Sequence, residues 1–183
     1  VNIRNQPGAA GTVTSNLNAL DVGHIFALGV IGADGQGYDL KKGLHSTNVN
    51  TDNLIESSDC FTPTYTKPIN QKTGQEHERQ DIKNRKPLSS DLEDQLIHRL
   101  RQLVPQMHGV IALDQVKEHN CGVLTDRVID ELSTLAEQYA NKTFFADSRT
   151  RIGDFKNVIL KPNRTEALEA ISLESKDETN QNL

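Results

Sequence analysis

Short apolar runs alternate along the chain with longer segments whose apolar residues repeat every three or four positions. The runs have strand length and lie at residues 24–31, 109–113, 143–146 and 158–160. The periodic segments between them are typical of helices. Strands alternating with helices favour an α/β fold with a mainly parallel sheet. The pattern predicts a three-layer architecture in which helices flank a central sheet.

Helix-start signals accompany the periodic segments. A helix is expected after the glycine turn at Gly8, and another from about Thr165. Ser90, with Glu93 three residues later, has the pattern of a capping box, and Thr125 can cap the next helix. The apolar face predicted after the first of these caps consists of Leu92, Leu96, Ile97, Leu100, Leu103 and Val104.

Residues 62–85 depart from this alternation. The segment 62–67 has β propensity, and 70–85 is almost wholly polar apart from Ile82. The stretch is too short for a domain linker, and core-like sequence flanks it on both sides. It therefore predicts an exposed hairpin or flap.

The composition is that of an ordinary globular domain, with 35% hydrophobic and 25% charged residues in 183. A net charge of -5 argues against a nucleic-acid surface. No apolar run is long enough to cross a bilayer. We expect a cytoplasmic protein without nucleic-acid or membrane partners. It would have one domain over residues 1–173 and a disordered polar tail at 174–183.

The two cysteines and six histidines show no metal-binding pattern. Cys60 and Cys121 form no C-x-x-C pair, so free thiols in a reducing compartment are expected. No two histidines stand four residues apart, which argues against a zinc site.

Polar residues directly follow three of the predicted strands. In open α/β sheets, ligands bind beyond the carboxyl ends of the strands. This rule selects Asp114, Asp147 and the segment 163–166. Asp and Asn also favour loops and helix caps for structural reasons alone. On position alone, that structural interpretation takes precedence at all three places.

Three motifs together resemble the ribokinase (PfkB carbohydrate kinase) family. Residues 7–17 (PGAAGTVTSNL) are similar to its N-terminal signature, a glycine hinge before a helix. Residues 27–37 (ALGVIGADGQG) resemble its second element, a strand ending in G-x-x-G-x-D-x-x-G. Residues 161–167 (KPNRTEA) resemble its N-x-x-E motif. Order and spacing agree with the family from about residue 1 to residue 170.

Each motif is weak by itself, and the conjunction carries the resemblance. Asn163 with Glu166 is also the pattern of a capped helix. The glycines between residues 29 and 37 could suggest a dinucleotide-binding oxidoreductase, but the G-x-G-x-x-G order is not met. The resemblance implies a partial, Rossmann-like ribokinase fold with a small β lid at 62–85.

Within the family, the predicted flap most resembles the kinases of heptose phosphates. There, a strand with threonine and lysine precedes an R-x-D strand, as do residues 62–67 (TPTYTK) and 78–83 (ERQDIK) here. Lys67 and Arg79 would suit a phosphorylated sugar, because a nearby cation offsets its negative charge. Both could equally be solvated charges. Since the family often dimerises through flap strands, a homodimer through the lid and a solvent-exposed lid both stay open.

The resemblance implies phosphoryl transfer from ATP to a sugar hydroxyl with the help of Mg²⁺. Asp114 matches a position that commonly contacts sugar hydroxyls. Asn163 and Glu166 would organise the phosphates and the magnesium, Glu166 as the metal-side residue acting through water. The substrate-binding residues implied in this way are Gly8, Ala9, Thr12, Lys67, Arg79 and Asp114.

The chain departs from the family pattern in three respects. Ala9 replaces the second hinge glycine, and Thr12 stands where the family usually has Asn. A hydroxyl there offers less than an amide, which has both a donor group and an acceptor. The family's G-A-G-D segment, with its catalytic Asp, does not occur, so we name no catalytic base and expect this chain to be inactive by itself. The alternative is a non-catalytic sugar- or nucleotide-binding module with the same fold.

Overall fold

A computed structural model describes residues 2–171 of the chain. The chain divides into two compact units, Val1–Arg85 and Lys86–Leu183, and each is described by itself. The polar tail expected at 174–183 lies outside the described residues, and the single domain expected over 1–173 stays a prediction. Within the described part, no helix has both the length and the apolar character needed to cross a membrane.

The described part of the first unit contains two helices and two pairs of parallel strands. Strand β1 pairs with β3, and β2 pairs with β4. The run 24–31, predicted as one strand, forms two, because the chain changes partner after Ala27, whose N–H still donates to Asn50 of β3. The elements are α1 (Ala9–Ala19), β1 (Ile25–Phe26), β2 (Gly29–Gly32), α2 (Gly35–His45), β3 (Val49–Asn50) and β4 (Leu54–Ser57).

A small apolar core holds the first unit together. Ile25, Leu44 and Val49 are buried in it, one each from β1, α2 and β3. Partly buried side chains from α1, α2 and the neighbouring strands pack around these three. Full burial of one such side chain contributes about 1.5–3 kcal/mol, so this cluster stabilises the unit together with Ile31 and Ile55, which are also buried.

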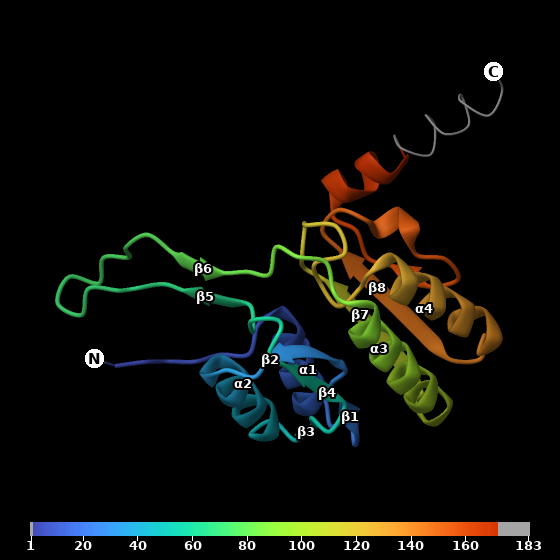
Figure 1. Cartoon of the computed structure of the whole chain (residues 1–183), viewed down its shortest axis with the longest axis horizontal. Coiled ribbons are helices and arrows are strands. Elements are labelled where there is room, and N and C mark those ends of the chain that lie inside the picture. The colour runs from blue at the N-terminus through green and yellow to red at the C-terminus, as the bar shows by residue number, and fades with distance from the viewer. Residues whose placement is uncertain (1, 172–183) are drawn as a thin grey trace. The chain divides into compact units, whose positions relative to one another are not determined.

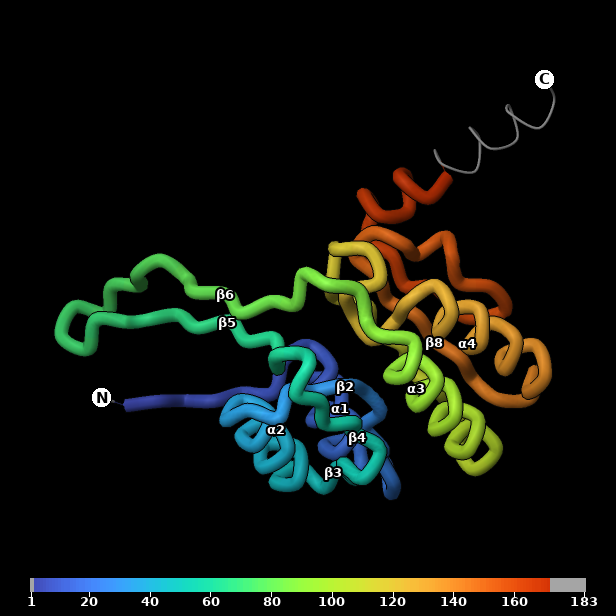
Figure 2. The backbone as a smooth tube through the Cα atoms, in the orientation of Figure 1, coloured from blue at the N-terminus to red at the C-terminus, as the bar shows by residue number. Residues whose placement is uncertain are grey.

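The predicted flap is confirmed as a hairpin of two short antiparallel strands, β5 (Thr64–Thr66) and β6 (Gln80–Ile82). Its two arms run side by side away from the rest of the first unit (Figures 1 and 2). An isolated two-stranded hairpin is only marginally stable in water, so contacts at its base matter. There, the Asn84 side chain makes two hydrogen bonds to the backbone of Phe61, of 2.9 and 2.8 Å.

The second unit contains a parallel sheet in the order β7-β8-β9. Helices α3 and α4 lie next to each other against this sheet (Figure 1). Residues 164–171 are helical up to the end of the described part. The expected α/β class, with parallel strands and flanking helices, is thus confirmed. The elements are α3 (Ser90–Leu103), η1 (Val104–Gln106), β7 (Gly109–Asp114), α4 (Asp126–Gln138), β8 (Thr143–Ser148), η2 (Ile152–Asp154) and β9 (Ile159–Leu160).

The caps of α3 and α4 show one correct prediction and one error. Thr125 caps α4 as predicted, its Oγ1 accepting the Val128 N–H at 3.4 Å. The cap of α3 is Ser89, one residue before the predicted Ser90. Two adjacent serines made the register ambiguous. With Ser89 as the cap, the third helical position is Leu92, so Glu93 does not complete a capping box. Its carboxylate instead accepts a hydrogen bond from Arg127 at 3.0 Å.

The apolar face predicted for α3 packs into the core of the second unit, together with buried side chains of α4. On α3, Leu92, Leu96 and Leu100 are buried, whereas Ile97 is only partly buried. The sheet contributes Phe144 and other side chains of β7 and β8 to the same core. The two cysteines are free thiols, Cys60 half-buried and Cys121 buried, in agreement with the prediction.

Candidate functional site

Two polar residues meet at the carboxyl edge of the sheet in the second unit. Asp114 ends β7, Ser148 ends β8, and the two are partners in the register of the parallel pair. The Ser148 hydroxyl donates to Oδ2 of Asp114 at 2.7 Å. Asp114 is 3% exposed and Ser148 is fully buried. Asp114, which the sequence rule selected, is therefore a buried carboxyl group that is hydrogen-bonded to Ser148.

Arg151 brings a positive charge to this carboxylate. It follows β8 in the chain, and its Nη2 lies 3.5 Å from Oδ2 of Asp114. Its Nη1 forms an ion pair of 3.0 Å with Asp126, in the first turn of α4. The guanidinium also donates to the carbonyl of Leu124. One arginine thus connects the residues that follow β8 with the end of β7 and the start of α4.

The pKa values of the two carboxyl groups beside Arg151 are shifted in opposite directions. Burial raises the pKa of Asp114, and the Ser148 hydroxyl and the Arg151 charge offset part of that rise. The hydrogen bond from Asn120 lowers the pKa of Asp126, with further contributions from His119 and Arg151. Asp126 therefore favours the anion, whereas burial of Asp114 works against its charged form.

Asn163 and Glu166 form a reciprocal helix cap. The Asn163 side chain accepts the Glu166 N–H at 3.0 Å, and the Glu166 carboxylate accepts the Asn163 N–H at 2.6 Å. The pair therefore caps a helix, which is the structural interpretation of this pattern. Within residues 2–171, no group of three or more His, Cys, Asp or Glu side chains could hold a metal ion. A metal role for Glu166 stays a prediction.

The glycine hinge of the first unit forms the start of α1. Gly8 is the N-cap residue, and its carbonyl accepts the Thr12 N–H at 2.9 Å and the Thr12 hydroxyl at 3.3 Å. Gly8, Ala9 and Thr12 are not buried, and a side chain at Gly8 would meet no atom within 4 Å. This turn is open to a ligand, but the Thr12 hydroxyl donates to its own helix.

The two flap cations have partners within the flap. Lys67 forms an ion pair of 2.8 Å with Glu76. Arg79 makes two hydrogen bonds to Asp81, of 2.6 and 2.8 Å, and its guanidinium lies 4.7 Å from the ring centre of Tyr65. Both contacts are exposed, where ion pairs contribute little to stability. The structure leaves these cations on the flap surface, and their role toward a substrate stays a prediction.

The motif at 29–37 proves to be a structural junction. Oδ1 of Asp34 accepts the Gly37 N–H at 2.7 Å, and Oδ2 accepts the Thr62 N–H at 2.9 Å. The Thr62 hydroxyl accepts the Gly32 N–H at 2.9 Å. A side chain at Gly32 would come within 2.8 Å of both the Cys60 carbonyl and the Thr62 nitrogen, so the glycine is required. The motif therefore ties the end of β2 and the start of α2 to the base of the flap.

The predicted site residues are distributed over both units. Asp114, Asn163 and Glu166 belong to the second unit, and the others to the first. Sequence reasoning missed Ser148 and Arg151. Both follow a predicted strand, so the rule that selected Asp114 could have extended to them.

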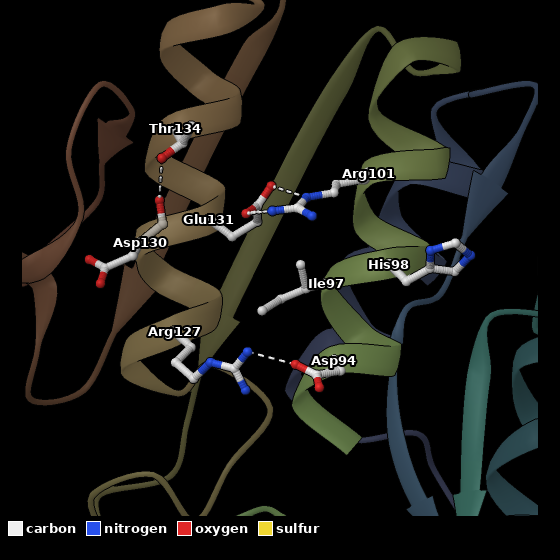
Figure 3. Close-up of a pocket in the computed structure, with 8 residues that line it drawn as sticks. All are labelled: Asp94, Ile97, His98, Arg101, Arg127, Asp130, Glu131 and Thr134. Atoms are coloured by element: carbon white, nitrogen blue, oxygen red, sulfur yellow. Dashed lines mark hydrogen bonds and ion pairs between the residues drawn. The ribbon is translucent and has the colours of Figure 1, made fainter. Parts of the chain in front are cut away.

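A shallow groove of about 480 Å³ lies on the surface of α3 and α4 (Figure 3). Ile97 and His98 contribute to its lining, and its ion pairs join Arg101 to Glu131 and Arg127 to Asp94. None of the predicted site residues lines this groove. The four charges of these two ion pairs neutralise one another, and Asp130 adds one further carboxylate to the lining.

Comparison with known proteins gives relatives by sequence, although no protein-family model matches the chain. The bifunctional protein HldE of Helicobacter pylori is 28% identical over 170 residues, 91% of this chain and 35% of that protein. HldE of Trichlorobacter lovleyi is 30% identical over 161 residues, 87% of this chain and 31% of that protein. The chain thus spans about a third of the length of these curated relatives.

Solved structures of sugar kinases share the fold. The 2-dehydro-3-deoxygluconokinase of Thermotoga maritima has a TM-score of 0.66 at 11% identity, over 90% of this chain and 53% of that one. A fructokinase with bound ATP from Xylella fastidiosa has a TM-score of 0.51 at 15% identity, over 91% of this chain and 48% of that one. The resemblance stated from the motifs is confirmed: the chain is a relative of the HldE proteins with the fold of the ribokinase-like PfkB sugar kinases.

Proposed function

We propose that the chain is part of a kinase that transfers a phosphoryl group from ATP to a sugar or sugar phosphate. The observation that carries this proposal is Asp114, an ordered carboxyl group at the carboxyl edge of a parallel sheet. In α/β folds that edge is where ligands bind. Similarity to the HldE proteins and to the fold of sugar kinases supports the same reaction class.

The predicted residues divide between a sugar side and an ATP side in this proposal. Asp114 would accept a hydrogen bond from a sugar hydroxyl, and the open turn at Gly8 and Ala9 would lie against the sugar. Phosphoryl transfer needs little covalent chemistry from the protein, so these residues would act by positioning the acceptor. ATP would bind on the side of Asn163 and Glu166.

Glu166 fits a magnesium ion held through water. Its carboxylate has the hard oxygen atoms that Mg²⁺ prefers, and Oε2 already accepts the Asn163 N–H. A single carboxylate suits an ion that keeps most of its water and is bound mainly by substrate phosphates. When bound, Mg²⁺ would neutralise charge on the ATP phosphates. Glu166 and Asn163 would orient the water around it.

The substrate that we propose is D-glycero-D-manno-heptose 7-phosphate. The support is the likeness of the flap to that of heptose-phosphate kinases, together with its two exposed cations. A substrate phosphate could exchange with the carboxylates that now pair with Lys67 and Arg79, because exposed ion pairs are weak. The same flap, with exposed Phe61, Tyr65 and Ile69, could pair with that of a second copy.

One observation favours a second candidate, a sugar- or nucleotide-binding module without catalysis. The hydroxyl of Thr12 donates within α1, at the position where the family usually has an amide. The sugar side therefore offers fewer polar groups than the family pattern. A module would still use Asp114 and the cap at Asn163, but it would need no catalytic base.

A coupled assay of ATP consumption, using the protein expressed from its natural gene, separates the two candidates. The acceptors would be heptose 7-phosphate, ribose and fructose phosphates, with binding measured by calorimetry on the same samples. Turnover with one acceptor is expected, lost in Asp114→Asn and kept in Asp130→Asn, an exposed carboxylate of α4. Binding without turnover would favour the module, and the absence of both would refute the proposal.

A further inference from the structure

Arg151 lies between two carboxylates that come from different elements. Its Nη2 approaches Asp114 at the end of β7, and its Nη1 contacts Asp126 in α4. The Arg151 side chain is only 14% exposed although it carries a full charge. An arginine desolvated to this extent needs good partners, because burying a charge without them is costly. The two carboxylates and the Leu124 carbonyl supply them.

Two side chains contact the same oxygen of Asp114. The Ser148 hydroxyl and the Arg151 guanidinium both approach Oδ2. The Val116 N–H also stabilises the carboxylate. With Oδ2 occupied in this way, the orientation of the carboxyl plane is fixed.

Arg151 is itself held from the opposite side. Asp126 accepts a hydrogen bond of 3.0 Å from the Asn120 side chain, and His119 Nε2 lies 3.0 Å from the same carboxylate. The Asn120 side chain also accepts the Asp126 N–H at 2.9 Å. The ionisable groups facing Arg151 are thus Asp114 and Asp126, with His119 beyond Asp126. This closed set of bonds leaves Arg151 little freedom to turn away.

We propose that Arg151 is the positioning residue for Asp114, and that it keeps this buried carboxyl group ionised and oriented to accept a sugar hydroxyl. The sugar part of this role rests on the proposed function, whereas the effect on Asp114 does not. Ser148 assists through its hydrogen bond and also accepts the Arg151 N–H at 3.0 Å. Arg149, two residues earlier, is exposed, and its side chain reaches Gln115 at 3.0 Å. It is therefore a matched control.

The test compares Arg151→Gln, Arg151→Lys and Arg149→Gln in the 183-residue chain. Carbon-13 NMR of the carboxyl groups gives the titration midpoint of Asp114, assigned with Asp114→Asn. In Arg151→Gln the midpoint is expected at higher pH than in the unmodified chain, because burial of the anion is no longer offset. Arg151→Lys keeps the charge but not the planar fork, so a smaller shift is expected. Arg149→Gln should leave the midpoint unchanged.

An unmoved midpoint in folded Arg151→Gln, or an equal shift in Arg149→Gln, would overturn the positioning role. If Arg151→Gln does not fold, the proposal stands or falls on whether Arg151→Lys moves the midpoint. A purely structural role would change stability without this shift. Calorimetry with heptose 7-phosphate is the second measurement, with binding expected to weaken about tenfold or more in Arg151→Gln. If the protein expressed from its natural gene binds no sugar, the proposed function fails, while the NMR result still decides the role of Arg151.

Discussion

The carboxylate of Asp34 accepts the backbone N–H of Thr62, 28 residues further along the chain, at 2.9 Å. The same side chain caps α2 through the Gly37 N–H at 2.7 Å. Thr62 closes the arrangement, because its hydroxyl accepts the Gly32 N–H at 2.9 Å. The motif at 29–37 is therefore also the anchor of the flap. Substitutions within the motif should therefore destabilise the base of the flap.

Asp34→Ala should destabilise the first unit by about 1–3 kcal/mol, because the N–H groups of Gly37 and Thr62 lose their acceptor. Amide hydrogen exchange by NMR measures the effect at each site, and exchange at Thr62 should accelerate most. The matched control is Asp39→Ala in the same helix, where an exposed carboxylate accepts one bond from Asn5. It should change stability by no more than about 0.5 kcal/mol. Equal losses in the two variants would contradict the anchoring role.

Gly37→Ala and Gly35→Ala should differ strongly although both lie in the first turn of α2. A side chain at Gly37 would collide with the Gly32 carbonyl and come within 3.0 Å of the Thr62 hydroxyl. A loss of about 1–3 kcal/mol is expected from such overpacking. At Gly35 the added methyl group meets nothing within 4 Å, so a gain of up to about 1 kcal/mol is expected from helix propensity. Urea unfolding followed by NMR peaks of the first unit would show the contrast.

Much of the fold could be predicted because its signals are local. The alternation of apolar runs with periodic segments gave the α/β class, and the polar stretch 62–85 gave the flap. The errors arose where local signals are ambiguous. The run 24–31 looked continuous because nothing in it marks a change of pairing partner, and Ser89 and Ser90 are equally good caps.

The candidate site was less predictable because its contacts are not local. Asp114 could be found from its place after a strand. Its partner Ser148 lies 34 residues away, and only the parallel register of β7 and β8 brings the two together. The hydrogen bond that the Thr62 N–H donates to Asp34 also depends on tertiary structure. Single-sequence patterns report spacing along the chain, so they identify such residues without showing which of them meet.

Asn163→Ala and Glu166→Gln should separate helix capping from metal binding. Loss of the Asn163 side chain removes the acceptor of the Glu166 N–H and should cost the helix about 1 kcal/mol. The amide of Glu166→Gln keeps an oxygen for the Asn163 N–H, so the helix should be little changed. Magnesium-dependent ATP binding should nevertheless weaken, because a neutral amide orients the hydrated ion less well. Exchange rates of the amides at 166–170 and ATP calorimetry with and without Mg²⁺ measure the two effects. Unchanged magnesium dependence in Glu166→Gln would leave the pair with a capping role alone.

The contributions of Asp34 and Asp114 to the free energy of unfolding should change in opposite directions as the pH rises. Burial works to raise the pKa of Asp34, but the N–H groups of Thr62 and Gly37 outweigh it and hold the pKa below 3.8. Its contribution to stability is therefore present above pH 3.8 and is lost as the pH falls through the folded value. Burial raises the pKa of Asp114 above 3.8, so its contribution is present below that pH and fades as the pH rises through the folded value.

The measurement is urea unfolding between pH 2.5 and about 7, followed by NMR peaks of each unit separately. The stability lost in Asp34→Asn should grow as the pH rises from the acid end, because the unmodified carboxylate gains its charge there. The stability lost in Asp114→Asn should shrink over the window above pH 3.8. The unmodified chain is the reference for both variants, and each profile is taken from the peaks of the unit that carries the substitution. If the stability lost in the two variants changed with pH in the same direction, the predicted opposite pKa shifts of Asp34 and Asp114 would be wrong.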